Sequence, residues 1–280
     1  MRREEHVLNG VFSYRYPGLG ADHALVVQHG IGSHAGAFDE FSAHHAARGV
    51  DVWSMDAPGH GRSLKGRPPG RFTLDEWVQA TVDLGEKVVH TSGLPVFVNG
   101  WGLGAAAAYG GLQASHTFGG AILMGYAIPS SPGLPTANPF RSEGYGELDE
   151  QWGDQLMLSV DRLIDFDDAY GYPGATEQMR ADPFGTRFYD LRSFASFFRY
   201  DPVVPINENT KPIFYTASLR DPIFGADFAK AIAAETAGPV ELHVLDRSSH
   251  QLMHSDTGQY SDLVLEWCLR QNTSSTSASP

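Results

Sequence analysis

The amino-acid sequence predicts an α/β domain built on a mostly parallel sheet with helices on both faces. Three observations support this prediction. Short apolar runs of strand length alternate with longer stretches of helical spacing, most runs end in glycine-rich or polar turns, and the alternation stops once, between about 129 and 205, before it resumes. Strands that alternate with helices at this spacing are typical of a parallel sheet covered on both faces.

The individual elements follow from the period of the apolar residues. Strands are expected at 24–27, 50–55, 95–98, 121–124, 212–216 and 240–245, and helices at 38–48, 74–90, 103–113, 226–235 and 258–269. Thr73 has the side chain of an N-cap for the second helix. Gly49 is placed to end the first helix.

The segment 129–205 is rich in proline, glycine, aromatic and acidic residues, and its acids are expected on a solvated face. We expect it to form a helical lid over one edge of the sheet, with helices at 152–164 and 191–198. The predicted core then comprises 1–128 and 206–270. The remaining residues, 271–280, are polar and low in complexity, which is typical of a disordered tail.

Composition excludes several classes of protein. The 280 residues include 20 Lys and Arg against 33 Asp and Glu, a net charge of −13, so the chain lacks the basic surface of a nucleic-acid binder. Cys268 is the only cysteine, which excludes an intrachain disulfide and thiolate zinc sites. The N-terminus lacks a signal-peptide pattern, and no apolar run reaches about 20 residues. We therefore expect a cytoplasmic protein with no stable membrane anchor and no metal; its oligomeric state stays open.

The most informative motif is Gly100-Trp101-Gly102-Leu103-Gly104, which lies between a predicted strand and a predicted helix. This is the context of the G-x-S-x-G nucleophile elbow, in which the central residue carries the nucleophile. Here the central residue is Gly102. A dinucleotide-binding loop is the alternative, but such a loop normally follows the first strand, and no acidic residue ends the next strand.

Three further segments favour the elbow. His29-Gly30-Ile31 follows the first buried strand, where the Ile31 amide could form an oxyanion hole with the Leu103 amide. Asp221 follows one late strand and His250 follows the last. The order elbow, acid, histidine is that of a hydrolase triad. Asp246 is a competing acid, but it lies only four residues before His250, so Asp221 is preferred.

Together these motifs resemble the α/β-hydrolase superfamily, and within it the monoacylglycerol lipase and lysophospholipase-like branch. The matching residues are 29–34, the Gly59-His60-Gly61-Arg62-Ser63 stretch within 56–63, Gly66-Arg67, the elbow, Asp221 and His250. The resemblance implies hydrolysis of carboxylic esters or lactones, a small-molecule substrate, and no cofactor. It also implies that a serine at position 102 would be the nucleophile.

Gly102 departs from that pattern. Glycine tolerates the strained backbone of an elbow, so Ser→Gly removes the attacking oxygen without disturbing the fold. We interpret Gly102 as an introduced Ser→Gly change that leaves the chain nearly inactive. The alternatives are a natural, non-catalytic ligand-binding protein and a cofactor-free oxygenase that uses the His250 and Asp221 dyad as its base.

Substrate contacts are expected from Gly30 and Trp101 beside the elbow, and from Phe184 and Phe188 among the phenylalanines of the insertion. Phe194, Phe197 and Phe198 of the insertion are further candidates to line an acyl or aromatic pocket. His29 and His60, each in a His-Gly turn, are interpreted as structural residues.

Overall fold

The computed structural model describes residues 3–126 and 143–276. Its centre is an eight-stranded sheet with the order β1-β2-β4-β3-β5-β6-β9-β10. The strands are β1 Glu4–Leu8, β2 Val11–Tyr16, β3 His23–Gln28, β4 Val50–Met55, β5 Val96–Trp101, β6 Phe118–Met124, β9 Ile213–Ser218 and β10 Val240–Leu245. β1 and β2 are antiparallel additions at one edge, and the pairs from β4 to β10 are parallel.

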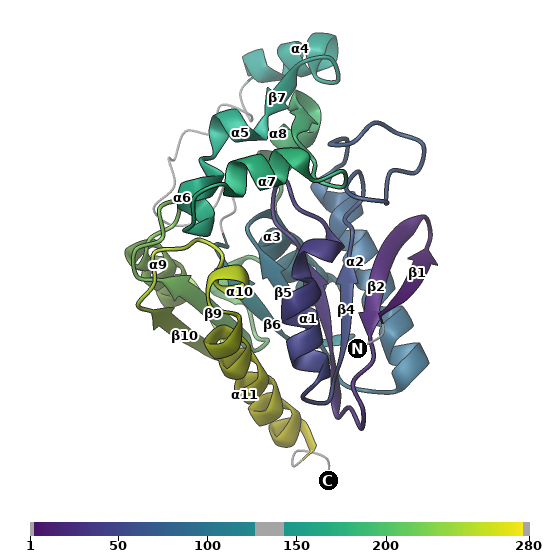
Figure 1. Ribbon diagram of the computed structural model, residues 1–280, viewed down its shortest axis with the longest axis vertical. Helices are drawn as coiled ribbons and strands as arrows, with labels where there is room; N and C mark the ends of the chain where they lie inside the picture. The colour runs from purple at the N-terminus through teal and green to yellow at the C-terminus, as the bar shows by residue number, and fades with distance from the viewer. Residues whose placement is uncertain (1–2, 127–142, 277–280) are drawn as a thin grey trace.

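Helices flank the sheet on both faces, and further short elements gather at one end of the molecule (Figure 1). Those in the sheet domain are η1 Ala35–Phe38, α1 Asp39–Ala46, α2 Leu74–Ser92, α3 Leu103–Ala114, η3 Ile206–Glu208, α9 Ala226–Glu235, α10 Leu252–Ser255 and α11 Thr257–Thr276. The insertion contains α4 Glu143–Trp152, β7 Met157–Ser159, α5 Val160–Leu163, α6 Phe166–Tyr170, α7 Ala175–Ala181, β8 Phe188–Asp190 and α8 Leu191–Arg199.

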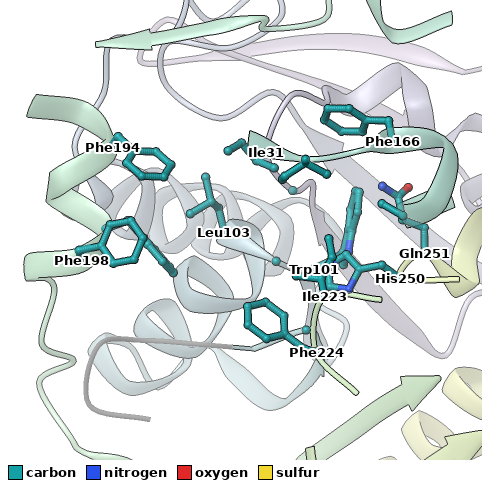
Figure 2. A pocket seen from close by; sticks show the side chains of 16 residues that line it. Ile31, Trp101, Leu103, Phe166, Phe194, Phe198, Ile223, Phe224, His250 and Gln251 are labelled. Atoms are coloured by element: carbon teal, nitrogen blue, oxygen red, sulfur yellow. The ribbon is translucent and has the colours of Figure 1, made fainter. Parts of the chain in front are cut away.

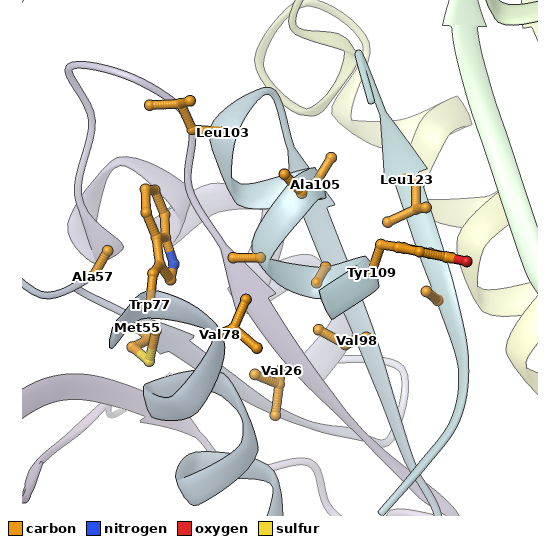
Figure 3. Close-up of a cluster of buried hydrophobic side chains, with 14 of the residues drawn as sticks. Val26, Met55, Ala57, Trp77, Val78, Val98, Leu103, Ala105, Tyr109 and Leu123 are labelled. Atoms are coloured by element: carbon orange, nitrogen blue, oxygen red, sulfur yellow. The ribbon is translucent and has the colours of Figure 1, made fainter. Parts of the chain in front are cut away.

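The sheet separates two hydrophobic cores because successive side chains of a strand point to opposite faces. In β3, Ala24 and Val26 belong to the core under α2, α3 and α9. Leu25 and Val27 belong to the core under α1 and α11. Figure 3 shows part of the first core. A strand buried on both faces reads as a continuous apolar run, which explains why the central strands were recognisable in the sequence.

The predicted α/β architecture is confirmed. α9 and β10 begin and end at the predicted residues. Thr73 caps α2 through a capping box with Glu76, and Gly93 ends that helix in the left-handed conformation. The first helix begins one residue later than predicted and is preceded by the 3-10 turn η1.

The N-terminal hairpin of β1 and β2 was not predicted. Both central residues of its turn, Asn9 and Gly10, have positive φ (51° and 75°). An Asn-Gly pair between two strands is the sequence signal of such a turn, so this hairpin could have been found. The strand β1 is largely exposed at the sheet edge and therefore lacks the apolar run on which the other predictions depended.

The predicted helix at 152–164 is wrong. α4 ends at Trp152, and the chain then forms β7, which pairs with β8 in a two-stranded antiparallel sheet, before the short α5. Helical periodicity within the segment could not reveal this pairing, because its partner lies about 30 residues further along. The predicted helix at 191–198 is present as α8.

The predicted boundary at 128/129 lies outside the described residues. The last helix, α11, continues to Thr276, seven residues beyond the predicted end and into the segment expected to be disordered. No helix in residues 3–126 and 143–276 is long and apolar enough to cross a membrane.

The elbow depends on close packing between α3 and the sheet. A Cβ atom on Gly104 would lie 2.1 Å from the carbonyl oxygen of His29, and one on Gly100 would lie 2.3 Å from the carbonyl oxygen of Gly104. These contacts are with backbone atoms, which cannot rotate away. Both positions therefore require glycine for steric reasons.

We predict that Gly104→Ala lowers the free energy of unfolding by about 3 kcal/mol or more, because overpacking against the backbone forces α3 away from β3. Urea denaturation measures the change. Gly146→Ala is the matched control: a Cβ there meets no atom within 4 Å, and the substitution should stabilise α4 by about 0.5–1 kcal/mol. Equal stability of the two variants would contradict the packing argument.

A second stability determinant is His45, which is buried in α1 against Phe41, with ring centroids 4.5 Å apart. Neither ring nitrogen has a hydrogen-bond partner among the described residues. Burial lowers the pKa of His45 to about 3. Between about pH 3 and 6.5 the unfolded chain therefore binds a proton at this position that the folded chain does not, and acidification favours unfolding.

His45→Leu should reduce the slope of unfolding free energy against pH by up to about 1.4 kcal/mol per pH unit between pH 3 and 6.5. The reason is that the variant no longer takes up a proton at position 45 when it unfolds. Denaturation series at several pH values give the slope, with His90→Leu at an exposed position of α2 as the control. An unchanged slope in His45→Leu would refute the assignment.

Candidate active site

The carboxyl ends of five parallel strands converge on one edge of the sheet, where open α/β sheets bind ligands. β3 leads to His29, Gly30 and Ile31, β5 to Gly102, and β6 to Gly125. β9 leads to Asp221 and β10 to His250. The structure therefore brings together residues that are up to about 220 positions apart in the sequence.

Gly102 occupies the turn between β5 and α3, with φ 55° and ψ −121°. L-residues rarely adopt this conformation, and holding one there costs about 1–3 kcal/mol. A Cβ at Gly102 would have the Cα of Gly30 as its nearest neighbour, at 3.8 Å, which is an ordinary van der Waals contact. In contrast to Gly100 and Gly104, this position has room for a side chain.

His250 and Asp221 form a buried hydrogen-bonded pair. The imidazole Nδ1 lies 2.7 Å from Oδ2 of Asp221, and both residues are less than 9% exposed. The other carboxylate oxygen, Oδ1, accepts the backbone N–H groups of Ile223 and Phe224 at 2.7 and 3.0 Å. With its carboxylate fixed in this way, Asp221 orients the ring and leaves Nε2 for chemistry.

Ile31 and Leu103, whose amides are the expected oxyanion donors, both line the same cavity. Within the described residues, neither the N–H of Ile31 nor that of Leu103 donates to a protein acceptor. Leu103 is the first residue of α3, where the helix dipole favours negative charge. His29 supports the Ile31 loop: its Nε2 accepts the Ala57 N–H at 3.0 Å, and its Nδ1 donates to the Gly30 carbonyl at 2.8 Å.

An apolar cavity of about 150 Å³ lies above these groups (Figure 2). Its floor contains Gly30, Ile31, Trp101, Gly102, Leu103, Gly125, His250 and Gln251, and the other lining residues are Ile164, Phe166, Ala169, Phe194, Phe197, Phe198, Ile223 and Phe224. Among the residues that the structure describes, the lining contains no carboxylate and no Lys or Arg side chain. The cavity therefore suits a neutral, apolar group.

The structure places Phe184 and Phe188 outside this cavity, so the expectation that they line it is corrected. Phe184 lies beside His34 and under the guanidinium of Arg62, and Phe188 is exposed on β8. Phe166 of the insertion lines the cavity instead, together with three phenylalanines of α8, Phe194, Phe197 and Phe198. Their i, i+3, i+4 spacing on α8 places them on one helix face, a signal that was available in the sequence.

Other lining residues were missed for different reasons. Ile223 and Phe224 lie two and three residues after Asp221, so the loop that carries the acid also forms a wall of the cavity. Ile164 is the last residue of the segment predicted to be helical and Phe166 lies two residues beyond it, and the periodicity of that segment gave no indication of the cavity.

The structure also shows where two other candidate residues, Asp246 and His254, lie, and it bears on a possible metal site. Asp246 is exposed and forms an ion pair with Arg220, away from His250. His254 does not face solvent: its ring stacks on Tyr170 at 5.6 Å, and burial lowers its pKa to about 4. Among residues 3–126 and 143–276, no group of three or more His, Cys, Asp or Glu side chains is arranged to hold a metal ion.

Gly125 is a site residue that the sequence did not reveal. It has φ 60°, and a Cβ there would lie 2.5 Å from Cε1 and 3.1 Å from Nε2 of His250. The absence of a side chain at the end of β6 therefore makes room for the imidazole. An apolar run that ends in glycine was the only indication available in the sequence.

The arrangement can support nucleophilic acyl transfer once a hydroxyl is present at position 102. A base would stand on one side of that hydroxyl, and two amide donors would be available for a developing oxyanion. In the chain with Gly102, His250 and Asp221 can still polarise a water molecule, but removal of the nucleophile leaves only weak residual catalysis in triad enzymes.

Sequence comparison supports this reading of the fold. A model of the family described as Serine aminopeptidase, S33, matches residues 20–257. A Monkeypox virus protein described as a monoglyceride lipase homolog is 29% identical over 157 residues, 53% of this chain and 54% of that protein. A Schizosaccharomyces pombe protein, provisionally named a monoglyceride lipase, is 29% identical over 106 residues, 37% and 24% of the two chains. The matches thus span about half or less of these relatives.

Solved structures agree over nearly the whole chain. A soluble variant of Saccharomyces cerevisiae monoglyceride lipase with a substrate analog has a TM-score of 0.77, at 14% identity over 96% of this chain and 94% of that one. A Bacillus coagulans carboxyl esterase with glycerol gives 0.76, at 18% identity over 97% and 98%. An N-acyl homoserine lactonase mutant with N-hexanoyl homoserine gives 0.71, at 17% over 97% and 98%. These likenesses confirm the α/β-hydrolase fold.

Gly125→Ala is predicted to displace the His250 ring from Asp221, because the new methyl group would overlap Cε1. Proton NMR should show the loss or a large shift of the hydrogen-bonded Nδ1 proton of His250. Gly146→Ala, which adds a methyl group in open space, should leave that resonance unchanged. A preserved resonance in Gly125→Ala would mean that the ring is not confined as described.

Proposed function

This chain belongs to the Serine aminopeptidase, S33, family, and we propose that, with a serine in place of Gly102, it hydrolyses carboxylic esters or lactones that carry an apolar acyl group. The proposal is carried by one observation: Gly102, the His250 and Asp221 pair, and the Ile31 and Leu103 amides lie around one apolar cavity. Within the described residues, neither amide N–H donates to a protein acceptor. The α/β-hydrolase fold alone would not support the proposal, since that fold hosts many functions.

The proposed reaction proceeds in two steps. The serine hydroxyl attacks the acyl carbon and gives its proton to Nε2 of His250, while Asp221 stabilises the imidazolium. The amides of Ile31 and Leu103 donate to the oxyanion, the C–O bond to the leaving alcohol breaks, and His250 protonates that alcohol. Water, deprotonated by His250, then attacks the acyl carbon of the acyl-enzyme; the bond to the serine oxygen breaks, His250 returns its proton to that oxygen, and the acid leaves.

The cavity supports an ester over a peptide as substrate, although the family description names an aminopeptidase. An aminopeptidase must hold the ammonium group of its substrate near the scissile bond, and an unpaired charge buried there is costly. Within residues 3–126 and 143–276, the lining of this cavity offers no carboxylate to pair with it. A neutral acyl chain or ring, in contrast, would bury its surface against Phe194, Phe197 and Phe198.

The proposal for the chain with Gly102 is binding with little turnover. The elbow retains its strained backbone, an open position for a side chain, and the His250 and Asp221 pair. These features support an introduced Ser→Gly change over a long loss of function. A natural ligand-binding protein is the second candidate, favoured by the complete cavity around a position that carries no nucleophile.

We predict that Gly102→Ser raises the rate of hydrolysis of a short p-nitrophenyl acyl ester by about 10⁴-fold or more. Loss of the serine from a triad costs on the order of 10⁶ in kcat, so its return should recover a large part of that factor. Initial rates of p-nitrophenol release at neutral pH measure the change for both chains.

Gly102→Ala is the matched control, since it places a Cβ on the same backbone without a hydroxyl and should stay inactive. Adding His250→Gln to Gly102→Ser should abolish most of the gain. If the folded serine variant is inert toward short esters, monoacylglycerols and lactones alike, the enzymatic proposal fails. Tight binding of one of these compounds without turnover would then support the ligand-binding candidate.

A further inference from the structure

The insertion makes two hydrogen bonds to the backbone of Gly32, in the loop that contains Ile31. The N–H of Gly32 donates to the hydroxyl of Tyr189 at 2.8 Å, and the carbonyl of Gly32 accepts the N–H of Thr186 at 3.0 Å. Tyr189 lies in β8, and Thr186 lies two residues before that strand. Gly32 has φ 77° and follows Ile31 directly, so these two bonds fix the loop next to the proposed oxyanion donor.

The Tyr189 hydroxyl has a second partner, His60, whose Nε2 lies 2.9 Å away. Nδ1 of His60 lies 3.0 Å from the Pro58 carbonyl and must carry the ring proton, so Nε2 is the acceptor. The hydroxyl therefore donates to His60 and accepts from Gly32. Tyr189 and His60 are both almost fully buried. Burial lowers the pKa of His60 to about 4, which keeps the ring a neutral acceptor near pH 7.

The other end of the loop is fixed independently. His29 binds the Gly30 carbonyl and the Ala57 N–H, as described above. Ile31 thus lies between two residues whose backbones are held by buried hydrogen bonds. Its own N–H has no acceptor within the described residues, so its direction depends on the peptides on either side.

We propose that Tyr189 is a positioning residue, which fixes the Ile31 amide through Gly32 and thereby makes the insertion part of the oxyanion hole. The role of that amide in catalysis rests on the proposed function, whereas the fixing of the loop does not. The insertion then has two tasks at the site. Its phenylalanines line the cavity, and residues 186–189 set the geometry of a hydrogen-bond donor on the sheet domain.

The Tyr189 hydroxyl satisfies a buried donor, the Gly32 N–H, and a buried acceptor, Nε2 of His60. Tyr189→Phe keeps the aromatic ring and removes only the oxygen, which leaves the Gly32 N–H and the His60 Nε2 without a partner. Buried polar groups that lose their partners favour local rearrangement toward water. Removal of a whole oxyanion donor costs about 10²–10³ in kcat, so a misplaced one should cost about tenfold or more.

The first test uses the chain with Gly102 and measures amide hydrogen exchange by NMR. In Tyr189→Phe, the Gly32 amide should exchange at least tenfold faster and the Ile31 resonance should shift, while Leu103 stays unchanged. Tyr172→Phe is the matched control, since its hydroxyl binds Gln178 within the insertion at 2.8 Å. Unchanged exchange at Gly32 in Tyr189→Phe overturns the proposal.

The second test uses Gly102→Ser as the parent. Adding Tyr189→Phe should lower kcat for the ester about tenfold and leave KM within twofold, because the lining of the acyl cavity is unaltered. Tyr172→Phe should change neither constant. An active parent whose kcat is insensitive to Tyr189→Phe overturns the proposal, since a merely structural hydroxyl would affect stability alone.

The two tests separate this inference from the proposed function. If Gly102→Ser is inert, the proposed function fails, and the exchange rate of Gly32 alone decides whether Tyr189 fixes the loop. If Tyr189→Phe does not fold, His60→Leu removes the acceptor that holds the same hydroxyl in place, so exchange at Gly32 should still rise selectively, by less than in Tyr189→Phe. The absence of that rise would count against the proposal equally.

Discussion

The close approach of α3 to the sheet is the constraint on which the candidate site depends. Gly100 and Gly104 allow helix and strand backbones to meet where any side chain would collide with a carbonyl oxygen. Because α3 begins so near β3, the Leu103 amide and the loop after His29 border the same cavity. The conformation of Gly102 follows from the same geometry, since the chain must reverse direction within one residue between β5 and α3.

Much of this arrangement could be predicted from the sequence because it is encoded locally. Strands buried on both faces, such as β5 and β9, form continuous apolar runs. Gly102, Asp221 and His250 follow, in that order, β5, β9 and the partly exposed edge strand β10. The insertion was less predictable. The pairing of β7 with β8 depends on contacts across many residues, so a segment with helical spacing at 152–164 contains a strand instead.

The candidate site likewise contains residues that could be predicted from the sequence and residues that could not. Gly125 and Ile223 could not be assigned from their own sequence neighbourhood, because their importance arises from proximity to His250 and to the cavity. The wrong choice of Phe184 and Phe188 has another origin. Phe184, Phe188, Phe194, Phe197 and Phe198 have the same hydrophobicity, and only the helical register of α8 distinguishes the last three, which line the cavity.

Gly32 accepts a hydrogen bond from the Thr186 N–H and donates one to the Tyr189 hydroxyl, and these two bonds limit how far the insertion could be exchanged as a unit. Topologically it is a single excursion from the sheet domain, a form of segment that recombination can replace as a unit. Here, however, a replacement insertion would also have to supply a donor and an acceptor for Gly32 and a hydroxyl for His60. Chimeras that retain residues 186–189 and exchange the rest of the insertion would preserve these hydrogen bonds while changing the walls of the cavity.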